Sequence, residues 1–182
     1  SPKAKPPSFP EQVATIEFRR GADGWDCQPG PIAPELSDVE SIYQAMMLGL
    51  RVYVHKTGFP SVVIGLSGGV DSALTAAVAA DALGPERVHT IMMPSPYTSA
   101  HSLEDAKACA EAIGVRCDIV GTEPAMEAFR TMTVPLFGGR KEDVTEENIQ
   151  SRARGLVLMA VSNKLGGMVV TPGNKSEMAG GF

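Results

Sequence analysis

Four short apolar runs, separated by segments of helical period, constrain the fold of this chain from residue 61 onward. The two kinds of segment alternate, with apolar runs at 62–66, 88–93, 117–120 and 168–171 and helical segments at about 70–83, 102–113, 124–132 and 146–165. Strands that alternate with helices are typical of a parallel sheet whose right-handed crossovers place helices on both faces. We therefore expect an α/β fold built on a doubly wound parallel sheet.

The first 36 residues have a different character from the rest. Seven prolines fall here, around a single strand-like run at 14–18. Ser37 and Glu40 then have the spacing of a capping box, which predicts the start of a helix, and Gly58 and Pro60 predict its end. We expect a connector at 1–36 and one globular domain at 37–182.

Composition narrows the class of protein. With 182 residues, of which 43% are hydrophobic, the chain can bury the core of about one domain. The formal net charge of −5 argues against a nucleic-acid partner, because such proteins favour a basic face. No segment has the apolar length of a membrane span. The three cysteines are odd in number and lack metal-ligand spacing, so we expect free thiols, as is typical of a reducing compartment. The sequence therefore predicts a cytoplasmic protein with neither a nucleic-acid nor a membrane partner.

The apolar run at 62–66 leads into a glycine-rich turn in the sequence VVIGLSGGVDS. Glycine permits positive φ and close backbone approach, so the N–H groups from Ser67 to Ser72 can converge on one anion at the positive end of the next helix. The turn lacks the lysine of a P-loop and the glycine register of a dinucleotide fingerprint. Asp71 would repel a phosphate unless a cation bridged the two, so its position predicts Mg²⁺ held between Asp71 and a departing pyrophosphate.

The SGGxDS pattern of this turn resembles the N-type ATP pyrophosphatases, which have the adenine nucleotide alpha hydrolase-like fold. Two further stretches, MPSPYTS at 93–99 and TPGNKSE at 171–177, resemble NAD synthetase in its larger, glutamine-dependent form. The resemblance runs from about Phe9 to Phe182. It implies that residues 1–36 connect an N-terminal glutaminase domain to a synthetase domain at 37–182, which is incomplete at its C-terminus.

The resemblance also implies the residues of a nucleotide site. The loop that binds the ATP phosphates comprises Gly65, Leu66, Ser67, Gly68, Gly69, Val70, Asp71 and Ser72. Asp71 and Glu177 are the expected catalytic acids and Mg²⁺ ligands, and Glu177 is also expected near deamido-NAD. Ser95 and Thr171 are expected near the adenosine of ATP.

A helix that is predicted to begin with Thr145 as its N-cap carries two further candidates. Asn148 and Arg152 lie one turn apart on one face, a pattern that is also typical of a solvated helix face. In the family, the corresponding residues bind deamido-NAD, whose nicotinate carboxylate and phosphates favour a cation. The resemblance therefore implies that Asn148 and Arg152 bind deamido-NAD.

The activity implied by the resemblance is the ATP-dependent amidation of deamido-NAD to NAD through an adenylated carboxylate, with ammonia from glutamine. Such a protein is a carbon–nitrogen ligase that takes Mg²⁺ as cofactor and ATP as co-substrate, and we expect a homo-oligomer. One alternative is another N-type ATP pyrophosphatase ligase, such as a GMP synthetase-like enzyme, since the loop is common to them. The other is a nucleotide-binding module without turnover, because the family has a longer segment between Glu177 and GGF than the chain has here.

Overall fold

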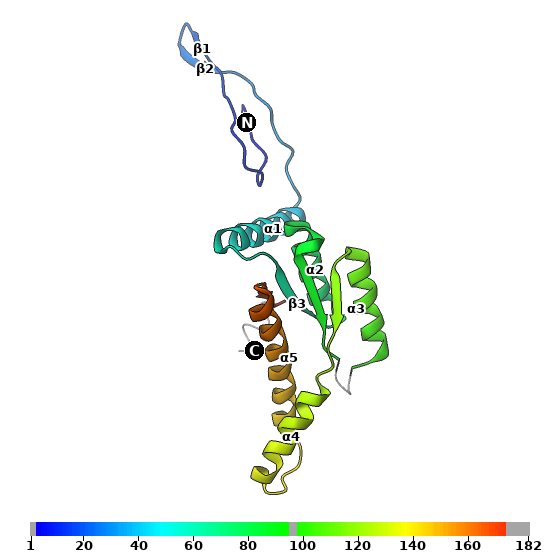
Figure 1. Cartoon of the computed structure of the whole chain (residues 1–182). Helices are drawn as coiled ribbons and strands as arrows, with labels where there is room; N and C mark the ends of the chain where they lie inside the picture. The colour runs from blue at the N-terminus through cyan, green and yellow to red at the C-terminus, as the bar shows by residue number, and fades with distance from the viewer. Residues whose placement is uncertain (1–2, 95–97, 174–182) are drawn as a thin grey trace. The chain divides into compact units, whose positions relative to one another are not determined.

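The computed structural model describes residues 3–94 and 98–173 (Figure 1). The chain forms two compact units, Ser1–Gly49 and Leu50–Phe182, and the boundary between them falls within helix α1 (Asp38–Thr57). The predicted site residues Ser95 and Glu177 lie outside the described residues.

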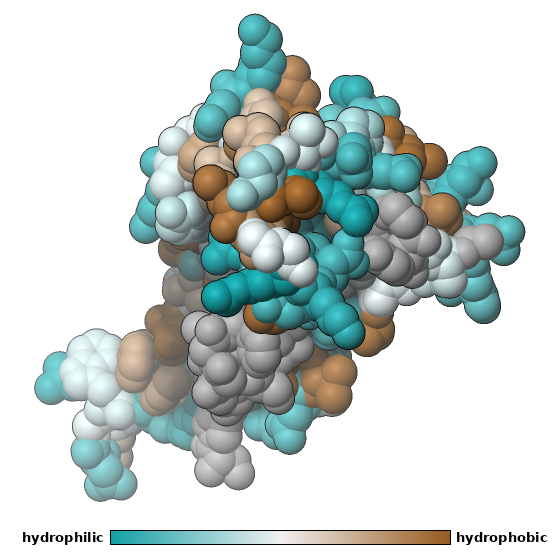
Figure 2. Space-filling view, turned by 90° about the horizontal axis from the view of Figure 1, so that it is seen from below, coloured by the Kyte–Doolittle hydropathy of each residue, from teal (hydrophilic) through white to brown (hydrophobic). Residues whose placement is uncertain are grey.

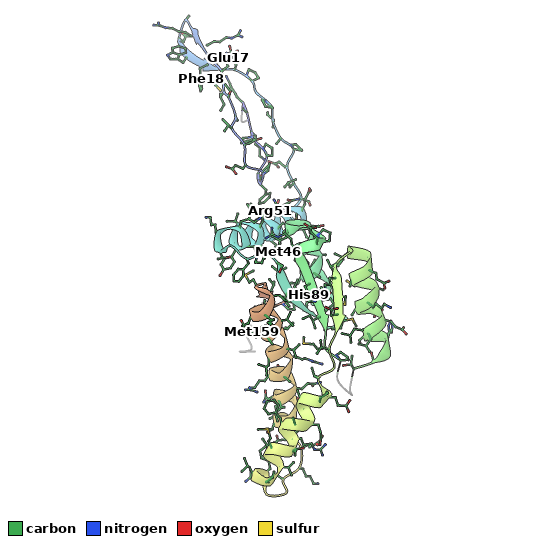
Figure 3. All side chains as sticks on the ribbon, viewed as in Figure 1. Glu17, Phe18, Met46, Arg51, His89 and Met159 are labelled. Carbon is green, nitrogen blue, oxygen red and sulfur yellow. The ribbon has the colours of Figure 1, made fainter. Side chains whose placement is uncertain are left out.

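The first unit contains a two-stranded antiparallel hairpin. Strands β1 (Phe18–Gly21) and β2 (Gly24–Cys27) pair with Phe18 opposite Cys27, and Gly24 at the turn has a φ of 128°. The predicted strand at 14–18 is therefore wrong, because only its last residue joins the ladder. The position of the tight turn decides which residues find a partner, and the apolar run alone does not show it. Phe18, labelled in Figure 3, and Trp25 are both exposed.

Helix α1 begins and ends where the sequence predicts. The hydroxyl of Ser37 accepts a hydrogen bond from the Glu40 N–H at 3.2 Å, as expected of an N-cap. The helix ends at Thr57 and is followed by Gly58, whose φ is 76° and whose N–H bonds the Val54 carbonyl at 3.1 Å.

The second unit is built on a four-stranded sheet with the strand order β5-β4-β3-β6. All three strand pairs are parallel. The elements in chain order are β3 (Val62–Leu66), α2 (Val70–Leu83), the short 3₁₀ helix η1 (Pro85–Arg87), β4 (Val88–Met92), α3 (Ala100–Ile113), β5 (Arg116–Ile119), α4 (Glu123–Phe137), α5 (Val144–Leu165) and β6 (Met168–Val170). The predicted doubly wound parallel sheet is confirmed.

The strand order places helices on both faces of the sheet. From β3 the chain passes through α2 to β4 and then through α3 to β5. It returns through α4 and α5 to β6, which lies on the other side of β3 (Figure 1). Right-handed crossovers put α2 and α3 on one face and α5 on the opposite face. The direction of winding therefore reverses between β3 and β6, and the carboxyl ends of the strands at such a switch point form a ligand crevice.

The two central strands lie in the core of the second unit, and they fix the point at which the crevice begins. Val62, Ile64 and Leu66 of β3 are buried, as are Ile91 and Met92 of β4. Strands that are buried on both faces are typical of parallel sheets covered by helices. The end of β3 is therefore held rigidly by packing.

Two helix boundaries differ from the prediction. Helix α4 continues past 132 to Phe137, because Pro135 lies in its last turn, where it removes a single hydrogen bond. The N-cap of α5 is Asp143, and the predicted N-cap Thr145 is wrong. The Asp143 carboxylate accepts a hydrogen bond from the Thr145 N–H at 2.8 Å, and the Glu146 carboxylate accepts one from the Asp143 N–H at 2.8 Å. The bond from Thr145 lowers the pKa of Asp143.

Candidate nucleotide-binding site

The loop between β3 and α2 lies at the carboxyl edge of the sheet, and Gly68 determines its shape. Gly68 has a φ of +85°, in the region that favours glycine. A Cβ at this position would collide with the carbonyl of Ser102 in the first turn of α3, and it would lie 3.1 Å from the Ser102 Cα. Both the backbone conformation and the contact with α3 therefore require glycine. No sequence signal predicts this contact, because the two residues belong to different elements.

Two serines predicted to contact phosphate bind each other within the loop. Ser72 is 2% exposed, and its hydroxyl accepts a hydrogen bond from the Ser67 N–H at 3.1 Å and donates one to the Gly69 carbonyl at 3.0 Å. The hydroxyls of Ser67 and Ser72 are 3.1 Å apart, and the Gly69 N–H donates to the Ser67 hydroxyl at 3.2 Å. These bonds hold the loop in a defined conformation through its own residues.

Three other residues of the predicted phosphate loop frame it through their backbones. Leu66 is buried at the end of β3, so only its backbone can reach a nucleotide. Gly65 faces α5, because a Cβ built there would lie 3.3 Å from the Leu158 Cδ1 atom. Val70 begins α2 with an exposed side chain, and its N–H stands at the positive end of the helix.

Asp71 lies in the first turn of α2 with its side chain exposed. Within the part of the chain that the structure describes, its carboxylate has no hydrogen bond or ion pair, and no group of three or more metal-ligating side chains occurs. A free carboxylate beside an anion site is a suitable oxygen ligand for Mg²⁺. The other predicted ligand, Glu177, lies outside the described residues, so the pairing of the two acids stays a prediction.

Thr171 is at the same edge of the sheet as the loop. It directly follows β6, in which Val170 pairs with Ile64 of β3. Thr171 is therefore level with Gly65, on the strand beside the one that leads into the loop. Its exposed side chain lies at the switch point. The resemblance implies that Thr171 is near the adenosine of ATP, and this role stays a prediction.

Asn148 and Arg152 are exposed in the N-terminal half of α5. The helix runs toward the amino ends of the strands, since it leads into β6, and Leu158 lies beside Gly65 near the carboxyl edge. Arg152 precedes Leu158 by six residues, or about 9 Å of helix, and therefore lies beyond the carboxyl edge. This part of α5 continues below the sheet in Figure 1, with α4 against it. The structure places both residues beyond the carboxyl edge of the sheet, with Arg152 Nη1 donating to the Asn148 backbone carbonyl at 3.2 Å.

A polar cluster elsewhere in the sheet has a structural role. His89 of β4, labelled in Figure 3, lies with its Nε2 atom 2.7 Å from the Asp118 carboxylate of β5, and Arg116 Nη2 donates to the same oxygen at 2.7 Å. The hydrogen bond with His89 is the main reason that the pKa of Asp118 is lowered. His89 is near the amino end of its strand, so this cluster ties β4 to the edge strand β5 away from the site.

A pocket of about 820 Å³ lies between α4 and α5. Six carboxylates and two arginines line it, and one of the arginines, Arg130, pairs with Glu142 at 3.2 Å. Such an acidic lining does not suit the phosphates of a nucleotide.

Figure 2 shows hydrophobic side chains, in brown, exposed among hydrophilic ones, in teal. The exposed hydrophobic residues of α4 and α5 include Leu136 and Leu156.

A protein-family model described as NAD synthase matches residues 42–182. The chain belongs to the NAD synthase family. A glutamine-dependent NAD(+) synthetase of Rhodobacter capsulatus is 50% identical to it over 176 residues, which are 97% of this chain and 32% of the relative. The chain thus spans about a third of the length of the curated relatives that it matches.

Solved structures of the family have the same fold. A glutamine-dependent NAD+ synthetase from Acinetobacter baumannii, in complex with adenosine diphosphate, superposes with a TM-score of 0.91 at 45% identity, over 97% of this chain and 33% of that one. An NH3-dependent NAD synthetase from Campylobacter jejuni superposes with a TM-score of 0.73 at 28% identity, over 81% of this chain and 62% of that one. The expected adenine nucleotide alpha hydrolase-like architecture is confirmed by these neighbours.

Proposed function

We propose that this protein catalyses the ATP-dependent amidation of deamido-NAD to NAD. The nicotinate carboxylate attacks the α-phosphorus of ATP, pyrophosphate leaves, and ammonia then displaces AMP from the adenylated carboxylate. The ammonia comes from the hydrolysis of glutamine, and this part of the proposal is supported by the glutamine-dependent relatives of Rhodobacter capsulatus and Acinetobacter baylyi. The protein is then a carbon–nitrogen ligase with ATP as its co-substrate.

The proposal rests on the backbone of the loop between β3 and α2 at the switch point, in a chain that belongs to the NAD synthase family. Among the described residues, the N–H groups of Gly68, Val70 and Asp71 have no hydrogen-bond acceptor. These groups stand at the N-terminal end of α2, where a helix favours an anion. They are suited to the pyrophosphate of ATP, and their stabilisation of its charge requires no nucleophilic side chain.

The side chains of the site have separate roles in this proposal. Asp71 holds Mg²⁺ together with Glu177, and the metal supplies charge neutralisation for the departing pyrophosphate. The guanidinium of Arg152 and the amide of Asn148 bind deamido-NAD beyond the carboxyl edge. Thr171 and Ser95 contact the adenosine of ATP, and Glu177 also contacts deamido-NAD.

The test is to measure pyrophosphate and NAD when the whole gene product is given ATP, deamido-NAD and either glutamine or ammonium. We expect one pyrophosphate for each NAD formed, with both nitrogen donors. Turnover with xanthosine monophosphate in place of deamido-NAD would instead support a GMP synthetase-like ligase. ATP binding without pyrophosphate release from any of these acceptors would support a nucleotide-binding module without turnover.

We also propose that the protein is a cytoplasmic homo-oligomer with neither a nucleic-acid nor a membrane partner. Between residues 3 and 173, apart from 95–97, no helix is both long enough and apolar enough to cross a membrane. Helix α4 has no buried residue and exposes Leu136, while α5 buries only Ala153 and exposes Leu156. Apolar surface of this kind favours a protein contact. Light scattering after gel filtration tests the oligomeric state, and a monomeric mass at micromolar concentration would contradict the proposed homo-oligomer.

A further inference from the structure

The first unit of the chain has no buried core of its own. None of its described residues, from 3 to 49, is buried, and the first buried side chain along the described chain is Val54 of the second unit. Cys27, the single cysteine of the first unit, is a free thiol. A two-stranded hairpin is at best marginally stable in water unless a further apolar surface covers it. The hairpin of β1 and β2 therefore needs a partner surface from outside the first unit.

The pairing of β1 with β2 sorts their side chains onto two faces. Residues that lie opposite each other in an antiparallel pair project to the same side, and side chains alternate along each strand. One face carries two aromatic rings, a guanidinium and a thiol, from Phe18, Arg20, Trp25 and Cys27. We call this the aromatic face. The other face carries Arg19, which lies opposite Asp26.

The charged groups of the other face find partners within the first unit. The Asp26 carboxylate accepts a hydrogen bond from Lys3 Nζ at 2.6 Å. Arg19 Nε donates to the Glu17 carboxylate at 2.9 Å. The N-terminal segment is held there by a bond from the Gly30 N–H to the Lys3 carbonyl at 2.8 Å. This face therefore requires no external partner for its charges.

The aromatic face has no such partners. Phe18, labelled in Figure 3, is 56% exposed and Trp25 is 72% exposed. Within the described part of the chain, the Arg20 guanidinium has neither a hydrogen bond nor an ion pair. Aromatic residues and arginine are enriched at the centres of protein interfaces, where they anchor binding. The aromatic face is therefore suited to a protein surface that offers an apolar centre and a carboxylate for Arg20.

The extent of the matches to relatives indicates where that surface belongs. The NAD synthase model begins at residue 42, after the hairpin. The glutamine-dependent synthetase of Rhodobacter capsulatus matches 176 of the 182 residues, so its match extends into the hairpin, and those residues are 32% of that relative. The hairpin is thus outside the synthase model but inside the match to a much longer, glutamine-dependent protein.

We propose that the aromatic face docks on the glutaminase part of the whole protein, which lies outside residues 1–182. This rests on the proposed function, in which glutamine supplies the ammonia. Charge disfavours a second copy of the hairpin as the occupant, because the same face meets itself in a symmetric contact. The aromatic face carries a guanidinium and no carboxylate, so such a contact would bring two cations together without an acid.

Photo-crosslinking of the whole protein identifies the surface that covers the hairpin. The photoreactive residue p-benzoylphenylalanine replaces Trp25 on the aromatic face or Arg19 on the other face, in a mixture of isotope-labelled and unlabelled protein. We expect position 25 to crosslink to peptides of the glutaminase part, in several times the yield of position 19. Crosslinks from position 25 to residues 1–182, of the same copy or of a second one as the mixed labelling shows, would overturn the proposal. The absence of crosslinks from position 25 would also overturn it.

Hydrogen exchange measures how firmly the hairpin is held and needs no bulky substitution. Amide exchange over residues 18–27 of the whole protein is compared in the wild type, in Arg20→Ala and in Arg19→Ala. The last is the matched control, because it changes the same residue type one position away on the opposite face. Loss of an interface anchor should raise exchange in Arg20→Ala by about fivefold or more, whereas loss of the exposed pair of Arg19 should change it by less than about twofold. Equal exchange in the two variants would contradict the docking.

Both measurements are independent of ATP, deamido-NAD and turnover. A whole protein that forms NAD from glutamine without crosslinks from position 25 to its glutaminase part would contradict the docking alone. Those crosslinks in a protein that forms no NAD would support the docking and contradict the proposed activity.

Discussion

The replacement of Gly68 by alanine tests how far α3 determines the shape of the loop. An alanine held at a φ of +85° costs about 1–2 kcal/mol, because its Cβ crowds the following carbonyl. The same Cβ meets the Ser102 backbone, which cannot rotate away as a side chain can, and such overpacking costs about 1–3 kcal/mol. We expect Gly68→Ala to lower the free energy of unfolding by roughly 2–5 kcal/mol.

Gly114→Ala is the matched control for this prediction. Gly114 ends α3 with a φ of +78°, and no atom lies within 4 Å of a Cβ built there. It therefore has the conformational cost of about 1–2 kcal/mol without the steric one. The difference between the two variants isolates the contact with Ser102.

Urea denaturation of both variants, followed by circular dichroism, measures the two free energies. Titration with ATP then measures nucleotide binding by the folded fraction of Gly68→Ala. We expect binding to be at least about tenfold weaker than in the wild type, because a displaced loop misplaces its N–H groups. Equal losses of stability in Gly68→Ala and Gly114→Ala would refute the reasoning, since the contact with α3 would then carry no energy.

Three further predictions concern charged residues. Asp71→Asn should abolish pyrophosphate release while the melting temperature stays within about 2 °C of the wild type, because the exposed carboxylate supports a metal and no core contact; normal turnover at millimolar Mg²⁺ would contradict the metal role. Arg152→Ala should raise the KM for deamido-NAD by about tenfold or more with little change for ATP, and Arg154→Ala, on the same helix, serves as its control. The lowered pKa of Asp118 predicts a stabilisation that is complete above its ordinary value of 3.8 and is lost as the pH falls through the lower folded value. Thermal unfolding between about pH 2 and 6 should show this loss, and His89→Ala should remove most of it.

The parts of the fold that follow from local pattern could be predicted from the sequence. Strand β3 and helix α2 have the predicted bounds, because the buried run, the glycine turn and the alanine-rich helix are each determined by neighbouring residues. The N-cap of α5 could not be chosen with the same ease. Asp143 and Thr145 are both N-cap residue types, and only the observed bond from Glu146 back to the Asp143 N–H decides between them.

The candidate site shows the same division. The sequence predicts the glycine turn after β3, and the family resemblance implies that Thr171 lies near the adenosine of ATP; the structure brings the carboxyl ends of β3 and β6 to one edge, while the roles of these residues stay predictions. It does not predict that Ser72 is buried with its hydroxyl bonded to the backbone of Ser67 and Gly69, because a polar residue in a first helical turn is usually exposed. Nor does it predict the contact between Gly68 and Ser102, which depends on how α3 packs in three dimensions.

The position of β6 beside β3 has a consequence for how the protein folds. Val63 and Val169 are neighbours in the sheet, yet they are separated by more than a hundred residues along the chain. A pairing of such long range forms slowly, because the entropy of the intervening chain opposes it until the rest of the sheet is in place. During synthesis, the loop between β3 and α2 leaves the ribosome well before the strand that forms the other side of its crevice. We therefore expect nascent chains that stop before Met168 to have the glycine turn without a competent nucleotide site, and β6 to dock late in folding.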